Sequence, residues 1–197
     1  MSQLTRRSAL KTTIGGLSTV MLGTLMAFDT RKPRLSFSTL GCPAWDLPTI
    51  LNTAVTAGYQ AVEFRGLMGE LDLTKSPAFS TATRAQQTRT QFADRGISIC
   101  NLGASTQLHH ADAAKRIKNL DEARRFIDLA HQLNCPFVRV FPDQLPTDQD
   151  REATLKLISD GLLELGNYAK SGSVTVLLES HGELTRSDLL YQIMHAA

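Results

Sequence analysis

Short apolar runs alternate with longer amphipathic segments five times along this chain. The apolar runs are predicted to be β-strands, because they are short and rich in β-branched and aromatic residues. The segments that follow them place apolar residues three and four positions apart, which is typical of helices packed on a core. The strands are predicted at residues 35–39, 61–65, 97–102, 137–141 and 174–178. Regular alternation of this kind predicts a parallel α/β architecture.

Two folds are consistent with five strand-helix units. A five-stranded doubly wound sheet would be complete with them, whereas a (β/α)8 TIM barrel needs eight units and typically about 250 residues. The chain has 197 residues, so the pattern alone favours the complete sheet. However, the loop after the first strand reads Leu40-Gly41-Cys42-Pro43 and lacks a glycine-rich phosphate-binding pattern. The doubly wound alternative therefore has no sign of its usual ligand site.

Several helices have sequence signals for where they begin or end. Asp46 is predicted to cap the first helix, and Gly58 lies where a left-handed residue commonly ends one. Thr147 with Asp150 resembles a capping box, and Ser187 is predicted to cap the last helix. These signals set the expected helix boundaries.

The fifth apolar run ends in Glu179 and, two residues later, His181. An apolar run without alternation is typical of a strand buried on both faces of a parallel sheet. Ligands of such folds bind at the carboxyl ends of the strands, where Glu179 and His181 fall. Side chains two residues apart on an extended chain point the same way, so the two groups could share a metal ion or a proton-transfer task. The simpler alternative pairs Glu179 with a neighbouring arginine and places His181 in a solvated loop.

Other charged residues also fall near predicted strand ends. Glu63 lies near the end of the second strand, and the loop behind it, residues 66–79, is long enough to favour a functional role. Arg139 lies in the fourth strand, where a buried arginine needs a carboxylate partner. His109 and His110 lie in the loop behind the third strand.

Composition places the chain among ordinary globular proteins. It is 42% hydrophobic and 20% charged, which is a normal balance. Its cysteines are Cys42, Cys100 and Cys135. They lie in different predicted elements and do not have the spacing of a disulfide framework or a metal knuckle. Small apolar fillers near strand ends are their expected role.

The first 34 residues have the features of a twin-arginine export signal, followed by a folded domain at residues 35–197. Thr5-Arg6-Arg7 and Lys11 precede an uncharged stretch, residues 12–28. Removing residues 1–28 takes away three basic residues and no acidic one, so the formal net charge falls from +2 to −1. A near-neutral domain lacks the clustered basic residues that nucleic-acid binding requires. We therefore expect an exported, periplasmic protein that contacts the membrane only through its signal and does not bind nucleic acid.

Four stretches together resemble the sugar phosphate isomerase/epimerase family. They read Gly41-Cys42-Pro43-Ala44-Trp45-Asp46, Gly58-Tyr59-Gln60-Ala61-Val62-Glu63-Phe64-Arg65, Val138-Arg139-Val140-Phe141 and Leu177-Leu178-Glu179-Ser180-His181. This family has the xylose-isomerase-like TIM barrel, which includes endonuclease IV, and the resemblance covers residues 35–197. It implies a partial (β/α)8 barrel of about five consecutive parallel βα units rather than a doubly wound sheet.

The resemblance also implies a divalent metal, commonly manganese, magnesium, cobalt or zinc. Glu179 matches the family's first ligand, and in such isomerases this glutamate can also move the proton beside a carbonyl. Glu63 matches a position that faces the substrate cavity, with an ion pair to Arg65 or Arg139 as the alternative. His181 is a further candidate substrate contact.

The His109-His110 pair resembles the additional histidine ligands of the endonuclease branch. A surface loop is the simpler interpretation of this pair. The family's remaining ligands, an Asp, a His and a second Glu, come from strands six to eight, and this sequence ends before them. We therefore expect either a fragment or a shortened member, which holds its metal weakly because catalytic sites supply three or more protein ligands.

The expected function is a metal-dependent isomerase or epimerase that acts on a sugar, a sugar phosphate or a related small molecule. One alternative is a non-catalytic sugar-binding or vestigial barrel. Another is an endonuclease IV-like phosphodiesterase, which the export signal and the near-neutral charge disfavour. The first and fifth strands would be sheet edges, and such edges favour association into a homo-oligomer.

Overall fold

The structure is a computed structural model, and it describes residues 33–197. Most of the predicted export signal, residues 1–32, lies outside this range. The strands are β1 (Ser36–Ser38), β2 (Ala61–Phe64), β3 (Ser98–Gln107), β4 (Phe137–Phe141) and β5 (Thr175–Leu178). The α-helices are α2 (Leu47–Thr56), α3 (Ala82–Asp94), α4 (Ala113–Leu133), α5 (Arg151–Ala169) and α6 (Ser187–Ala196). No helix within residues 33–197 is long and apolar enough to cross a membrane.

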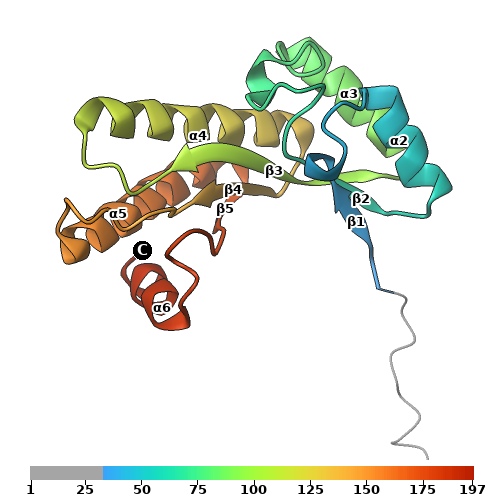
Figure 1. The fold of residues 1–197 in the computed structure, drawn as a ribbon. Helices are drawn as coiled ribbons and strands as arrows, with labels where there is room; N and C mark the ends of the chain where they lie inside the picture. Colours follow the sequence, from blue (N-terminus) through green and yellow to red (C-terminus); the bar gives the residue numbers. More distant parts are fainter. Residues whose placement is uncertain (1–32) are drawn as a thin grey trace, which may run out of the picture. The chain divides into compact units, whose positions relative to one another are not determined.

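The five strands form one parallel sheet with the order β1-β2-β3-β4-β5 (Figure 1). A doubly wound sheet would place β1 between β2 and β3. Consecutive order is instead that of successive units around a TIM barrel. The partial-barrel prediction is therefore confirmed, and the doubly wound alternative is wrong.

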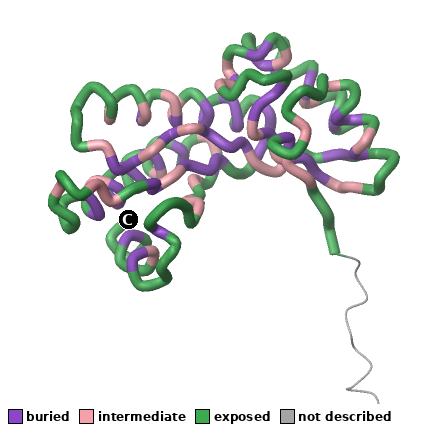
Figure 2. The backbone as a smooth tube through the Cα atoms, viewed as in Figure 1, coloured by how far each residue is buried: buried purple, intermediate pink, exposed green. Residues whose placement is uncertain are grey.

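One face of the sheet is apolar and is covered by helices. Val62, Phe64, Val138 and Val140 alternate along β2 and β4, and each is fully buried. The Phe64 ring packs against Phe92 of α3 with the ring centroids 5.7 Å apart. Figure 2 shows this burial as purple segments that run through the strands. The residues between them on the strands point to the opposite face, which corresponds to the inner wall of a barrel.

Aspartates cap two of the helices that carry cap signals. The carboxylates of Asp46 and Asp150 each accept a hydrogen bond from the backbone N–H three residues later, at 2.9 and 2.8 Å. Thr147 is not the cap of α5, because residues 147–149 form a turn and Asp150 is the extended residue before the helix. Arg186, rather than Ser187, occupies the cap position of α6 and makes no side-chain cap bond. The helices themselves were therefore predicted correctly, but the residues predicted to cap α5 and α6 were wrong.

The β5 strand is less buried than predicted. Thr175 and Leu177 are exposed, with 36% of Leu177 accessible, whereas Val176 and Leu178 are half-buried. Within residues 33–197, β5 pairs only with β4, so one of its edges has no neighbouring strand. The prediction of a strand buried on both faces is wrong, because the face that carries Thr175 and Leu177 is open.

Candidate functional site

Polar side chains gather on the inner face of the sheet, opposite the face that the helices cover. Glu63 and Arg65 come from β2 and the residue after it, Arg139 and Phe141 from β4, and Glu179 from the residue after β5. The guanidinium carbons of Arg139 and Arg65 lie 4.1 and 5.9 Å from the centre of the Phe141 ring. Because the strands are parallel, their carboxyl ends share one edge of the sheet. We call these five residues the inner-face site.

Glu179, the predicted ligand and base, is paired with an arginine. Its backbone N–H donates to the Val140 carbonyl at 3.0 Å, which continues the pairing of β4 with β5 beyond the strand. Its Oε2 lies 2.7 Å from Nε of Arg139, and 41% of the Glu179 side chain is accessible. The arginine pairing that the sequence allowed as the simpler alternative is therefore present. The carboxylate nevertheless keeps an accessible part on the inner face.

Arg139 is a buried arginine with a carboxylate partner, as its position in the fourth strand predicted. Only 7% of the residue is accessible. Its Nη1 donates to the Ala104 carbonyl at 3.0 Å, and its guanidinium lies over the Phe141 ring. Burial lowers the pKa of Arg139 because the charged form loses hydration, and Glu179 opposes this shift. The guanidinium therefore fixes the position of the Glu179 carboxylate.

Replacing Arg139 with Ala is expected to lower the free energy of unfolding by about 2–3 kcal/mol. The change removes an ion pair, a hydrogen bond and the packing on Phe141. Because Glu179 is partly exposed, the loss should stay below the roughly 3–5 kcal/mol typical of a fully buried pair. Urea unfolding followed by circular dichroism measures it. The control is Arg89→Ala in α3, expected to change stability by less than about 0.5 kcal/mol; equal losses for the two variants would contradict the prediction.

Glu63 is held by an amide. The Nδ2 of Asn101 donates to its Oε1 at 3.1 Å. No ion pair of Glu63 is found within residues 33–197, so the alternative pairing with Arg65 or Arg139 is wrong. Asn101 reaches Glu63 because β3 carries one extra residue, Cys100, opposite the step from Val62 to Glu63. A bulge of this kind changes the face to which the next side chain points.

His181 packs beside the inner-face site and is held by a carboxylate. Its Nδ1 lies 2.9 Å from Oδ1 of Asp143, and its ring centroid lies 4.7 Å from that of Phe141. Asp143 is buried and has a left-handed backbone, with φ of 73°. A carboxylate on Nδ1 fixes the orientation of the imidazole and leaves Nε2 for another partner. Sequence reasoning did not identify Asp143, although a carboxylate two residues after a strand was a usable signal.

His109 and His110 are not on a surface loop. His109 is only 5% accessible, and the two ring centroids lie 4.1 Å apart. His110 Nε2 lies 3.2 Å from Oε1 of Gln107, whose amide nitrogen also bonds to Asp143. Burial lowers the pKa of both histidines, which favours their neutral forms. The pair lies in the loop after β3, which continues to Gln107, five residues beyond its predicted end. The surface-loop interpretation is wrong because this loop is buried at His109 and half-buried at His110.

The described residues do not by themselves fit the implied metal. Within residues 33–197, no group of three or more His, Cys, Asp or Glu side chains is placed to hold an ion. Glu179 is paired with Arg139, and His181 with Asp143. A catalytic cation needs about three protein ligands, so these residues alone do not supply a complete metal site.

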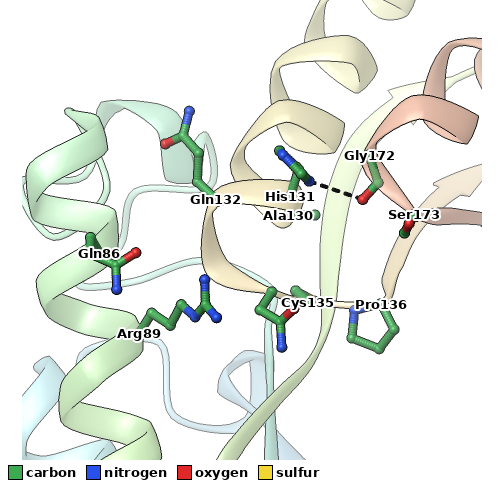
Figure 3. A pocket seen from close by; sticks show the side chains of 10 residues that line it. Gln86, Arg89, Ala130, His131, Gln132, Cys135, Pro136, Gly172 and Ser173 are labelled. Carbon is green, nitrogen blue, oxygen red and sulfur yellow. Dashed lines mark hydrogen bonds between the residues drawn. The ribbon is translucent and has the colours of Figure 1, made fainter.

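A hollow of about 660 Å³ lies at the opposite end of the sheet (Figure 3). Residues 134–136 lead into β4 and residues 172–173 approach β5, so this hollow is at the amino ends of the strands. Arg89 of α3 and His131 of α4 also line it, and His131 Nδ1 lies 3.0 Å from the Gly172 carbonyl. None of the residues predicted for the site lines this hollow. The inner-face site is therefore the candidate that combines converging charges with the carboxyl ends of the strands.

The sequence profile of a family described as xylose isomerase-like TIM barrel matches residues 51–194. The chain belongs to this family. The resemblance drawn from the strand-end motifs is thereby confirmed, and the observed strand order is that of the family's barrel. No curated protein sequence matches the chain.

Solved structures with the same fold include sugar epimerases. The IolI protein, crystallised with a bound zinc atom, is 19% identical with a TM-score of 0.69, covering 83% of this chain and 58% of IolI. An L-ribulose 3-epimerase is 18% identical with a TM-score of 0.60, covering 75% of this chain and 49% of the enzyme. D-psicose 3-epimerase from Clostridium cellulolyticum H10 is 11% identical with a TM-score of 0.63, and the match covers 82% of this chain and 60% of the enzyme. The chain thus spans at most 60% of the length of these three proteins.

Proposed function

We propose that this chain supplies the first five strand-helix units of a sugar isomerase or epimerase, which moves a proton on the carbon next to a carbonyl. One observation carries the proposal: the Glu179 carboxylate is fixed by Arg139 and stays partly accessible on the inner face of a family barrel. A carboxylate held in place beside a substrate can serve as a general base. The structural neighbours that are named as sugar epimerases support the same reaction class.

The proposed roles follow from the donor and acceptor atoms that each side chain does not use within the protein. Glu179 takes the proton from the carbon next to the carbonyl. Glu63, oriented by Asn101, accepts hydrogen bonds from sugar hydroxyls. His181 offers its Nε2 to another hydroxyl while Asp143 holds its Nδ1. Positioning of this kind lowers the barrier because the base is already oriented when the substrate binds.

We expect divalent metal to bind weakly to the 197-residue chain, because Glu179 is its one residue that matches the family's ligand set. Calorimetric titration with manganese should show no tight, stoichiometric site. A tight site would contradict this expectation, and His109, His110 and His181 would then be the ligands to examine. A form that continues through strands six to eight should bind manganese tightly.

Proton exchange in deuterium oxide tests the proposed reaction. Aldoses and ketoses are incubated with the longer form, and proton NMR follows the loss of the signal from the carbon next to the carbonyl. Exchange is the expected result. Sugar binding without exchange would instead favour a non-catalytic sugar-binding barrel. Cleavage of DNA containing an abasic site would favour the phosphodiesterase alternative.

We also propose export to the periplasm through the twin-arginine route. The support is the Arg6-Arg7 pair before an uncharged stretch. Replacing both arginines with Lys is expected to leave the protein in the cytoplasm, as measured by fractionation and immunoblotting. A variant of Arg34, which lies outside the motif, is the control. Unchanged export of the double variant would contradict the proposal.

A further inference from the structure

Arg65 is the cation of the inner-face site that has no carboxylate partner within residues 33–197. It follows β2 directly, and its backbone N–H donates to Oγ1 of Thr39 at 2.9 Å. That hydroxyl, on a fully buried residue, donates in turn to the Gly66 carbonyl at 2.7 Å. The Thr39 hydroxyl therefore holds the backbone at Arg65 and at the next residue, Gly66.

The side chains of Arg65 and Arg139 cross the same glycine. A Cβ at Gly103 would lie 2.6 Å from Cδ of Arg65 and 2.7 Å from Nη2 of Arg139. Both guanidinium groups also approach the ring of Phe141. Only glycine leaves room for this crossing, because any other side chain at position 103 would displace at least one arginine. The fold thus accommodates two like charges next to each other.

The two arginines differ in how their charges are compensated. Arg139 bonds to the Glu179 carboxylate and to the Ala104 carbonyl. Within residues 33–197, Arg65 has no carboxylate within 4.0 Å, and its Nη1 is buried without a hydrogen-bond partner. Glu63 does not compensate it, because no ion pair joins the two residues and the Glu63 carboxylate is bonded to Asn101. A buried donor without a partner costs free energy, so an acceptor supplied by a ligand would bind favourably.

We propose that Arg65 binds an anionic group, a carboxylate or a phosphate, on the sugar that enters the inner-face site. This inference rests on the proposed function and narrows its substrate class to sugar acids or sugar phosphates. The guanidinium of an arginine can donate two parallel hydrogen bonds to two oxygens of a carboxylate or phosphate. A neutral hydroxyl has one oxygen and cannot accept both bonds in this way. Arg65 is only partly buried, and its guanidinium lies near the Phe141 ring on the inner face. Arg139 adds to the positive potential but keeps its bond to Glu179.

Binding of matched neutral and anionic sugars to the full chain tests the inference. D-gluconate is compared with D-glucose for the carboxylate, and D-ribose 5-phosphate with D-ribose for the phosphate, by calorimetry or ligand-observed NMR. We expect at least one anionic sugar to bind about tenfold or more tighter than its neutral counterpart, the size of one charged hydrogen bond. The pair that shows the preference identifies which anion the site takes.

Three variants test whether the anionic group binds at Arg65. Arg65→Gln should bring the anionic and neutral affinities close together, and Arg65→Lys should retain part of the difference because it keeps the charge but loses the fork. Arg89→Gln, at the other end of the sheet, should leave the difference unchanged. Circular dichroism checks that each variant is folded. If Arg65→Gln does not fold, the test rests on Arg65→Lys, which must still reduce the preference for the anionic sugar.

The outcomes separate this inference from the proposed function. Equal affinities for anionic and neutral sugars, or no binding of either, would overturn the role of Arg65. A preference for the anion that survives both Arg65 variants would overturn it as well, because the anion would then bind elsewhere. A preference that depends on Arg65 together with no proton exchange would support the anion site and contradict the isomerase activity.

Discussion

Replacing Glu179 with Gln is expected to reduce turnover at least about 1,000-fold in the form of the protein that catalyses proton exchange. An amide cannot accept the proton that the carboxylate is proposed to take. Gln keeps a side-chain oxygen near Arg139, so the structure around the arginine is largely preserved. The measurement is the rate of deuterium incorporation at saturating sugar. The loss should lie in kcat, because an interaction that forms in the transition state is removed.

The control for this variant is Glu164→Gln in α5. Glu164 also pairs with an arginine, Arg124, but it is exposed and lies within a helix rather than at the end of a strand. Its replacement should leave turnover unchanged. If Glu179→Gln retains more than a tenth of the turnover while folded, another group is the base. Glu63→Gln would be the next variant to measure.

Replacing Gly182 with Ala is expected to lower the free energy of unfolding by about 3 kcal/mol, by combining backbone strain with overpacking. Gly182 has φ of 61°, in the left-handed region that disfavours residues with a Cβ. A Cβ at this position would also lie 2.2 Å from the carbonyl oxygen of Asp143. The loops after β4 and β5 would have to separate, which would weaken the bond from Asp143 to His181. Urea unfolding measures the loss.

Alanine variants of two other glycines separate the cost of backbone strain from the cost of overpacking. Gly58 has φ of 75° with open space around it, so Gly58→Ala should cost only about 1 kcal/mol from the backbone strain. Gly166 lies inside α5 with no atom near its Cβ position, so Gly166→Ala should stabilise the protein by about 0.5–1 kcal/mol. A Gly182→Ala cost no larger than that of Gly58→Ala would show that the loops adjust freely.

The elements and their order could be predicted from the sequence because they depend on local patterns. Sequence patterns located the five strands and the five α-helices of residues 33–197, and Asp46 and Gly58 marked the ends of α2 correctly. Periodicity did not by itself distinguish a barrel from a doubly wound sheet, since both use the same units. The strand-end motifs made that choice, and the strand order and the family match confirm it.

Candidate site residues could be proposed from the sequence where a charged side chain follows a strand. Glu179 and Glu63 follow this rule, and Arg139 was correctly expected to have a carboxylate partner. Which carboxylate it takes was not predictable, because both Glu63 and Glu179 were available. Phe141 was missed as a member of the site, since an apolar residue in an apolar strand gives no chemical signal.

What the sequence by itself determined was the set of strands, the helices between them and the acidic residues at the strand ends. The tertiary structure alone decided the contacts that depend on packing between strands. The extra residue at Cys100 turns Asn101 toward Glu63, and the absence of a side chain at Gly103 lets Arg65 approach Arg139. The length of β3 likewise brings the Gln107 amide to the Asp143 carboxylate. Periodicity is a local property of the chain, whereas register and close approach are set only when neighbouring strands pack together.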